Sequence, residues 1–536
     1  MSYLFNADET NTPYQLEIPG HGTLTGYKFK SSLTGEDTTV RYAKVPYALP
    51  VSSKDRFKKA LAIPDDYDYT GDYGEVGLKC PQPSVPHAIF NYKKGPSKEE
   101  IQYCNVFVPT GEPPAGGWPV LFYIHGGWLQ YNSPNNVFTD TTDTNGAFKD
   151  KYILVSPGYR LNMFGFLSCK ELLEEDPESS NVGFWDQRMA LEWTYKYIKY
   201  FGGNPDMITI GGLSAGAYSV FFQLAYELYF PKAQQIIKQC LFQSNLVYCQ
   251  PKTIKETQAQ FDELCEKLGY NGLTSAEKLA KLRELDSFFI EDFIPTLSMH
   301  TFRAVTDDKF VPSGLIKDLS SGEFTKKMVS KGIRLLIGEV DNEPWKYSML
   351  NTPTTKDELK LQVENYYPAE VVEPLLKVYP DFNELDPNDP DFQEKLRIVF
   401  GDITSDGQVH ASSRGFINQM VKFGFPQEQI YRYRISYRAE FNDAALPKEL
   451  RVIHGLDFSL WFYHMKPYKP EEVKVATTWC SPFLQFLNFK SQIDDWKSTD
   501  YKKINYLTKD GEIEYIDDPL FARGVEVADA VYNAQV

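Results

Sequence analysis

The stretch "TIGGLSAGAYS", residues 209–219, places Ser214 between Gly212 and Gly216. The apolar run "MITI" leads into it and predicts a buried strand, and "AGAYSVFFQLAYEL" continues from it and predicts a helix. A sharp strand-to-helix turn needs small residues where backbones approach, and it presents the serine hydroxyl above the sheet edge. The Ala215 amide lies at the predicted helix N-terminus, where free N–H donors and the dipole favour negative charge. The stretch predicts a nucleophile; the alternative is a glycine-bounded turn with an inert serine.

Short apolar runs alternate with helical patterns along much of the chain, which predicts an α/β fold with a mostly parallel sheet. The predicted strands cover residues 119–124, 152–156, 207–210, 240–243, 333–338 and 430–437. Polar helical patterns at about 252–330 and 355–399 fall between these strands, and one of them opens on the cap-and-glutamate pattern of Thr274 and Glu277. We expect both regions to be insertions that form a cap or one wall of a cleft. No linker is visible, so residues 1–536 are predicted to form a single domain.

Composition and charge exclude several classes of protein. With 56 basic and 72 acidic residues, the formal net charge is −16, which disfavours binding to nucleic acids and to anionic lipid surfaces. No apolar segment is long enough to span a bilayer, and neither a secretory signal nor an N-glycosylation sequon is visible, so we expect a cytoplasmic protein. Seven cysteines without a CxxC pair predict reduced thiols rather than a disulfide framework. We expect no metal and no organic cofactor.

A glycine-rich loop follows the predicted strand "PVLFYI". It reads His125-Gly126-Gly127-Trp128, and such a loop can aim backbone N–H groups at a developing oxyanion. We therefore predict an oxyanion hole made by the amides of Gly127, Trp128 and Ala215, with Gly126 permitting the turn. The alternative is an ordinary Gly-Gly turn after a strand.

A nucleophilic serine needs a base, and the base needs a third group to orient it. The loop "LRVIHGLDFSLWF" follows the strand at 430–437 and supplies His454, which we prefer over the other histidines beyond the serine, His300, His410 and His464. The segment "IRLLIGEVDNEPW" supplies three candidate acids, Glu339, Asp341 and Glu343.

Several segments together resemble the type-B carboxylesterase family, which includes cholinesterases and some fungal lipases. They are "VRYAKVPYALPVSSKDRFKKA", "CNVFVP", "GYRLNMFGFL" and the long run "NVGFWDQRMALEWTYKYIKYFGGNPDMITIGGLSAGAYSV". The resemblance extends from about Gln15 to near Tyr532. It implies an α/β-hydrolase fold, a twisted sheet flanked by helices, and a Ser214–His454–Glu343 triad. The family's acid lies five residues after the glycine that ends its strand, which favours Glu343 over Asp341.

The chain departs from the family pattern around these residues. Leu213 stands where a glutamate is usual, and Trp128 stands where a small residue is usual; its indole is expected either to narrow the acyl pocket or to pack outward. Pro344 replaces a common glycine and is expected to bias Glu343 towards extended backbone angles.

The family's cysteine pattern is also broken. Cys80 matches its first disulfide cysteine, but the partner position is Ile101, so the bridge is predicted to be absent. Cys249 and Cys265, where some members have a second bridge, are expected to be free thiols. The segment between Cys80 and Cys104 carries Phe90 and Tyr92 but no tryptophan, which argues against cholinesterase activity.

The resemblance implies a serine carboxylic-ester hydrolase that acts on small to medium esters through an acyl-enzyme. A small-molecule ester is the expected partner. Two alternatives stay open: a lipase for longer acyl chains, and a non-catalytic interaction protein on the same fold.

Overall fold

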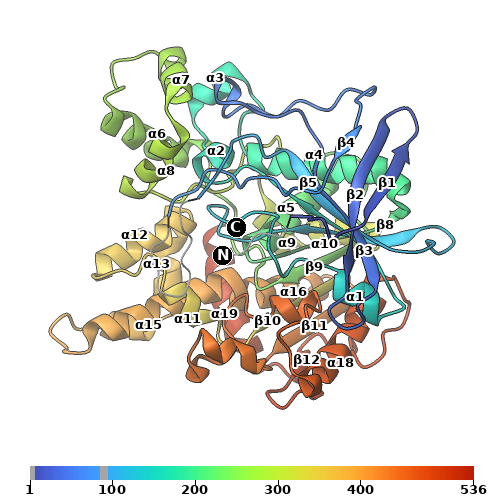
Figure 1. Ribbon diagram of the computed structural model, residues 1–536. Helices are drawn as coiled ribbons and strands as arrows, with labels where there is room; N and C mark the ends of the chain where they lie inside the picture. Colours follow the sequence, from blue (N-terminus) through green and yellow to red (C-terminus); the bar gives the residue numbers. More distant parts are fainter. Residues whose placement is uncertain (1–5, 85–94) are drawn as a thin grey trace.

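The computed structural model describes residues 6–84 and 95–536, so Phe90 and Tyr92 lie outside the described residues. Within the described ranges, the strands form one large mixed sheet (Figure 1). The strands are β1 Pro13–Ile18, β2 Gly22–Lys30, β3 Asp37–Pro46, β4 Gly71–Asp72, β5 Tyr103–Pro109, β6 Trp118–Ile124, β7 Ile153–Pro157, β8 Gly203–Leu213, β9 Gln239–Gln243, β10 Arg334–Val340, β11 Ile430–Ile435, β12 Lys503–Leu507 and β13 Ile513–Asp517.

The sheet has a parallel centre and antiparallel edges. Its order is β1-β2-β3-β5-β7-β6-β8-β9-β10-β11-β12-β13, with the short β4 paired to β2. The strands from β7 to β12 in that order pair in parallel, whereas β5 runs antiparallel to β7 and β13 runs antiparallel to β12. The loops after parallel strands meet at one edge of a sheet, so the segments after β6, β8, β10 and β11 come together there. The prediction of a mostly parallel α/β sheet is confirmed.

Helices cover the sheet and extend beyond it. They are α1 Thr142–Ala147, α2 Asn162–Phe166, α3 Lys170–Glu175, α4 Val182–Tyr197, α5 Ala215–Tyr229, α6 Ile254–Leu268, α7 Ser275–Glu284, α8 Ser287–Phe293, α9 Leu315–Ser321, α10 Glu323–Lys331, α11 Glu343–Ser348, α12 Lys356–Tyr366, α13 Ala369–Lys377, α14 Pro380–Glu384, α15 Phe392–Ser405, α16 Ala411–Lys422, α17 Phe458–Trp461, α18 Pro470–Leu487 and α19 Phe521–Ala534. A short π-helical segment, Asp406–His410, joins α15 to α16.

Each of the six predicted strands coincides with a strand of the sheet, from β6 to β11. These strands are apolar throughout because the parallel centre is buried on both faces; in β6, for example, every residue after the first is buried. The capping pattern at the start of α7 is also present: the Thr274 hydroxyl accepts from the Glu277 amide, and the Glu277 carboxylate accepts from the Thr274 amide.

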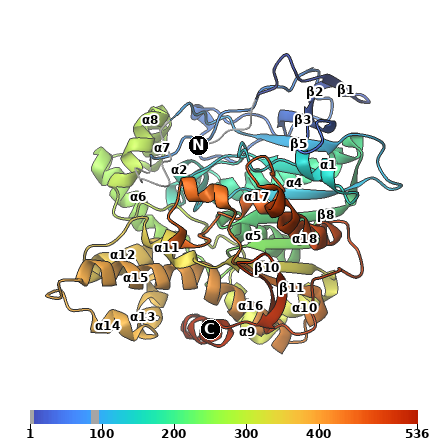
Figure 2. The ribbon, with the colours of Figure 1, turned by 60° about the horizontal axis from the view of Figure 1, so that its bottom comes forward.

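The two polar regions expected as insertions are helical. The first, 252–330, contains α6 to α10, and its helices α6, α7 and α8 lie on the same side of the molecule as α12 to α15 of the second, away from β1 to β3 (Figures 1 and 2). The expectation of a cap or cleft wall does not hold for α9 and α10, which pack against α16 instead. That arrangement gives the molecule a helical wall beside the sheet. The single domain over residues 1–536 stays a prediction.

A buried ion network ties the last helices to the sheet. Arg414 of α16 donates to both carboxylate oxygens of Glu339 in β10, at 2.8 and 2.7 Å, and to Asp518 at 2.9 Å. Arg432 of β11 also pairs with Asp518. Because all four side chains are buried, each charge depends on its partner within the network.

Candidate active site

Ser214 lies at the turn between β8 and α5, in a backbone conformation that L-residues rarely adopt, with φ 58° and ψ −126°. Its amide donates to the carbonyl of Gln243 at 2.7 Å, which fixes the turn to β9. Gly216 allows the close approach, since a Cβ there would lie 2.0 Å from the carbonyl oxygen of Ile124. A strained non-glycine residue costs on the order of 1–3 kcal/mol and persists only where its surroundings hold it.

The glycine loop after β6 packs directly against this turn. A Cβ on Gly126 would lie 2.5 Å from the carbonyl oxygen of Leu213 and 3.0 Å from the Cβ of Ser214. Gly127 and Trp128 then follow with φ of 116° and 57°, and the turn brings Gly127 against the backbone of Tyr131. The glycine loop and the N-terminus of α5 therefore lie next to each other at Ser214.

His454 and Glu343 meet although 111 residues separate them: His454 Nδ1 lies 2.5 Å from Glu343 Oε2. Both side chains are buried, and Glu343 Oε1 also accepts from the Val340 amide at 3.1 Å. His454 follows β11, and the next residue faces the nucleophile turn, since a Cβ on Gly455 would lie 3.4 Å from Leu213 Cδ2. The structure thus brings the predicted acid and base together beside the turn that carries Ser214.

The backbone of Glu343 differs from the expectation based on Pro344. Glu343 is the first residue of α11 rather than part of an extended segment. Proline is tolerated in the first helical turn because the amide it lacks would have no intrahelical partner there.

The other two carboxylates of this segment have arginine partners. Glu339 is held by Arg414, and Asp341 lies 3.1 Å from Arg434 and accepts from the Ser436 hydroxyl at 2.6 Å. Of the three candidate acids, Glu343 is the one that contacts His454.

Burial and nearby charges shift the pKa values of His454 and of two side chains beside it, Lys346 and Asp457. Burial lowers the pKa of His454, and the Lys346 ammonium lowers it further, while the Glu343 carboxylate opposes both. Lys346 donates to the His454 carbonyl at 3.2 Å, and burial lowers the pKa of Lys346 to about 8. Burial raises the pKa of the neighbouring Asp457 to about 7. A neutral imidazole at neutral pH follows, as a general base requires.

Two aromatic side chains enclose the imidazole. The Tyr347 ring lies edge-on to His454 with centroids 5.1 Å apart, and the Trp128 ring lies 5.8 Å from Tyr347 and 6.5 Å from His454. Trp128 therefore packs inward. The buried Tyr347 hydroxyl approaches the Ser214 side chain and has no well-aligned hydrogen-bond partner elsewhere in the described chain.

The sequence interpretation missed both Lys346 and Tyr347. They follow Glu343 within about one helical turn, so a helix starting at Glu343 would have carried them to its side of the site.

The other candidate histidines and the cysteines have different surroundings, and His300 lies 3.1 Å from the Thr301 hydroxyl. His410 contacts Asp406 at 3.1 Å, and the His464 ring packs edge-on against Phe138. All seven cysteines are buried free thiols, including Cys80, Cys249 and Cys265.

Neither a membrane span nor a metal cluster emerges from the part of the chain that the structure describes. None of its helices combines the length and the apolar character needed to cross a bilayer, and no three potential ligand side chains among its His, Cys, Asp and Glu residues gather closely enough for a metal ion. The cytoplasmic location stays a prediction.

Comparisons with known proteins agree with this geometry. Residues 12–524 match the carboxylesterase family. An uncharacterized esterase/lipase of Schizosaccharomyces pombe is 43% identical over 97% of both chains, and a carboxylic ester hydrolase of Gibberella moniliformis is 32% identical over 98% of this chain and 95% of its own. The crystal structure of Aspergillus niger EstA superimposes with a TM-score of 0.75 at 19% identity, covering 98% of this chain and 99% of that one. The chain belongs to the carboxylesterase family and is a carboxylic ester hydrolase.

Proposed function

We propose that Ser214, His454 and Glu343 form the catalytic triad of a carboxylesterase that acts on small to medium esters through an acyl-enzyme. The observation that carries the proposal is the buried 2.5 Å contact of Glu343 with His454 Nδ1, beside a serine on a strained strand-to-helix turn. Acid, base and nucleophile come from the ends of β10, β11 and β8, which open at the same sheet edge.

In acylation, Ser214 Oγ attacks the ester carbonyl while His454 Nε2 accepts the serine proton. Glu343 accepts the hydrogen bond from Nδ1–H, which fixes the tautomer and stabilises the imidazolium. The imidazolium then gives its proton to the leaving alcohol as the ester C–O bond breaks. In deacylation, His454 takes a proton from water as the water oxygen attacks the acyl carbon. The bond between the acyl carbon and Ser214 Oγ then breaks, Oγ takes the proton back from the imidazolium, and the carboxylic acid is released.

The carbonyl oxygen becomes negatively charged in both tetrahedral intermediates. The amides of Gly127, Trp128 and Ala215 are assigned as the donors that hold it, with Gly126 permitting the close turn. Removing one such donor typically costs about 3–4 kcal/mol in the barrier, so these amides contribute a large share of the rate.

Preference for smaller esters is supported by Trp128, whose buried indole packs beside His454 and Tyr347 where the family usually has a small side chain. A lipase for longer acyl chains is the neighbouring possibility, and the dependence of rate on acyl length separates the two.

The test is the hydrolysis of p-nitrophenyl esters of increasing acyl length by wild type and Ser214→Ala, together with mass spectrometry after treatment with a phosphonate ester. We expect activity on short acyl chains, its loss in Ser214→Ala, and a single adduct on Ser214. A folded wild-type protein that neither turns over nor forms the adduct would overturn the proposal, and an optimum at long acyl chains would favour the lipase.

A further inference from the structure

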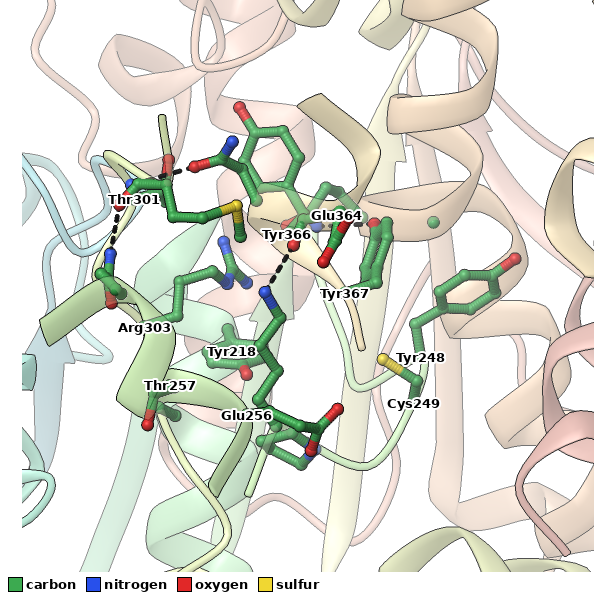
Figure 3. Close-up of a pocket in the computed structure, with 18 of the residues that line it drawn as sticks. Tyr218, Tyr248, Cys249, Glu256, Thr257, Thr301, Arg303, Glu364, Tyr366 and Tyr367 are labelled. Atoms are coloured by element: carbon green, nitrogen blue, oxygen red, sulfur yellow. Dashed lines mark hydrogen bonds between the residues drawn. The ribbon is translucent and has the colours of Figure 1, made fainter. Parts of the chain in front are cut away.

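A cavity of about 90 Å³ lies between the two helical insertions, close to the nucleophile turn. Its walls come from α5, the segment after β9, α6, the segment before α9, the end of α12 and the π-helical segment (Figure 3). Tyr218 forms one wall and lies a single turn beyond Ser214 on α5, with its amide donating to the Ser214 carbonyl at 3.0 Å. At about 1.5 Å of rise per residue, that turn places the cavity wall roughly 6 Å along the helix from the serine.

Arg303 points into this cavity between two tyrosine rings (Figure 3). Its guanidinium carbon lies 4.9 Å from the centroid of Tyr218 and 5.6 Å from that of Tyr366. The Nε–H is buried without an acceptor, and no ion pair joins Arg303 to a carboxylate in the described residues. A guanidinium that is oriented by stacking but lacks an anion is prepared to bind one.

The other charged groups of the cavity are Lys252, Glu256 and Glu364. Lys252 donates to the Glu364 main-chain carbonyl at 2.7 Å and adds a second cation. The Glu256 carboxylate is already used, since it accepts from the amide and the hydroxyl of Thr253 at the start of α6. Both lining carboxylates attract Lys252, and Glu364 is the one that is not engaged by the start of α6.

Two amide side chains, Asn245 and Gln408, also line the cavity. Asn245 donates to Gln408 at 3.0 Å, and Gln408 donates to the Tyr367 hydroxyl at 2.7 Å. The volume of about 90 Å³ is large enough for a planar group of a few atoms.

We propose that this cavity is a subsite for a carboxylate, and that the enzyme prefers esters whose short acyl part ends in one, such as monoesters of dicarboxylic acids. The Arg303 guanidinium binds the carboxylate, and Lys252 adds attraction. The ester carbonyl at the other end of the acyl part then reaches Ser214. The inference rests on the proposed function and adds the class of substrate.

The experiment compares kcat/KM for mono-4-nitrophenyl glutarate with that for 4-nitrophenyl pentanoate, a neutral acyl group of the same length. Wild type is expected to favour the glutarate ester, and Arg303→Met is expected to lower the glutarate-to-pentanoate ratio by about tenfold or more, since a charge-assisted hydrogen bond is lost. Glu364→Gln removes a carboxylate that attracts Lys252 and is expected to raise the same ratio. Free glutarate should inhibit pentanoate hydrolysis competitively in wild type.

The matched control is Arg523→Met. Arg523 also stacks on a tyrosine, 5.0 Å from the Tyr379 ring, but it lies outside the cavity, so the ratio should not change. A ratio that stays within about twofold of wild type in both Arg303→Met and Glu364→Gln overturns the subsite. If Arg303→Met does not fold, the Glu364→Gln ratio and the glutarate inhibition decide. Pentanoate hydrolysis monitors the proposed function separately, because its absence in wild type would contradict the esterase mechanism itself.

Discussion

Two buried carboxylates, Glu339 and Glu343, lie four residues apart in the chain, and each belongs to a different cluster of charged side chains. Glu339, in β10, is bound by Arg414 at 2.7 and 2.8 Å, whereas Glu343, at the start of α11, is bound by His454 at 2.5 Å. In both clusters a buried carboxylate accepts hydrogen bonds from a cationic or potentially cationic side chain. The side chain that donates to the carboxylate determines whether the cluster stabilises the fold or transfers protons.

An arginine keeps its proton at every accessible pH, so the Glu339 cluster holds elements together and cannot transfer protons. Although burial alone would raise it, the Arg414 guanidinium lowers the pKa of Glu339 to about 2. Histidine exchanges its proton near neutral pH, so the same kind of carboxylate can support proton transfer when it meets His454. The comparison assigns stability to one cluster and chemistry to the other.

The largest expected effect is on the rate in Glu343→Gln. The amide can still accept from the Val340 amide, but it disturbs the His454 tautomer, so kcat should fall by about 10³–10⁴-fold with the fold retained. Steady-state hydrolysis of a p-nitrophenyl ester and circular dichroism measure the two properties.

Asp341→Asn is the matched control, because Asp341 belongs to the same segment but pairs with Arg434. Its kcat should stay within about threefold of wild type. If Asp341→Asn lost the activity and Glu343→Gln kept it, the assignment of the acid would move to Asp341.

Arg414→Met, a substitution in the Glu339 cluster, is expected to lower the free energy of unfolding. It leaves Glu339 buried without its guanidinium, and breaking a buried pair in this way costs about 3–5 kcal/mol. Urea unfolding followed by fluorescence measures the loss, and kcat per folded molecule should change little. Full stability combined with lost catalysis would contradict the division between the clusters.

The pH dependence gives this prediction a second readout. The pKa of Glu339 is lowered from 4.5 to about 2, so its contribution to stability is complete above pH 4.5 and is lost as the pH falls towards 2. Arg414→Met should remove most of that decline.

Local patterns predicted the parts of the site that depend on neighbouring residues in the chain. The turn at Ser214 requires glycines at fixed positions, and the loop at Gly126 requires another, so sequence spacing carries that information. The choice of Glu343 over Asp341 came from the family resemblance, because all three acids in that segment are compatible with a sheet edge. Their actual partners lie 75 to 111 residues away, and sequence spacing does not show them.

Lys346 and Tyr347 were missed for a different reason. The expectation of extended backbone at Glu343 left no helix there, and without the helical repeat these side chains have no predicted direction. The Arg303 cavity was not predictable either, since its walls come from six separate segments that only the folded chain brings together.

The smallest expected effect concerns the pH profile and Lys346, whose ammonium donates to the main-chain carbonyl of His454. Lys346→Met removes an ammonium that disfavours the imidazolium, so the pKa of His454 should rise. Because the base must be neutral, the acidic limb of kcat/KM should move to higher pH by less than about one unit, with little change at pH 8. Activity at pH 6 should therefore fall relative to wild type.

Lys346→Arg keeps the positive charge and is expected to keep the wild-type pH profile. This control separates the effect of the charge from that of packing, because the Lys346 ammonium also lies 5.9 Å from the Trp128 ring. The Glu343 carboxylate, which favours the imidazolium, is present in both variants. A limb that moves equally in both variants would assign the effect to packing. A limb that moves only in Lys346→Met would show that the positive charge of Lys346 adjusts the pKa of the catalytic base, whereas none of the four side chains in the Glu339 network exchanges its proton near neutral pH.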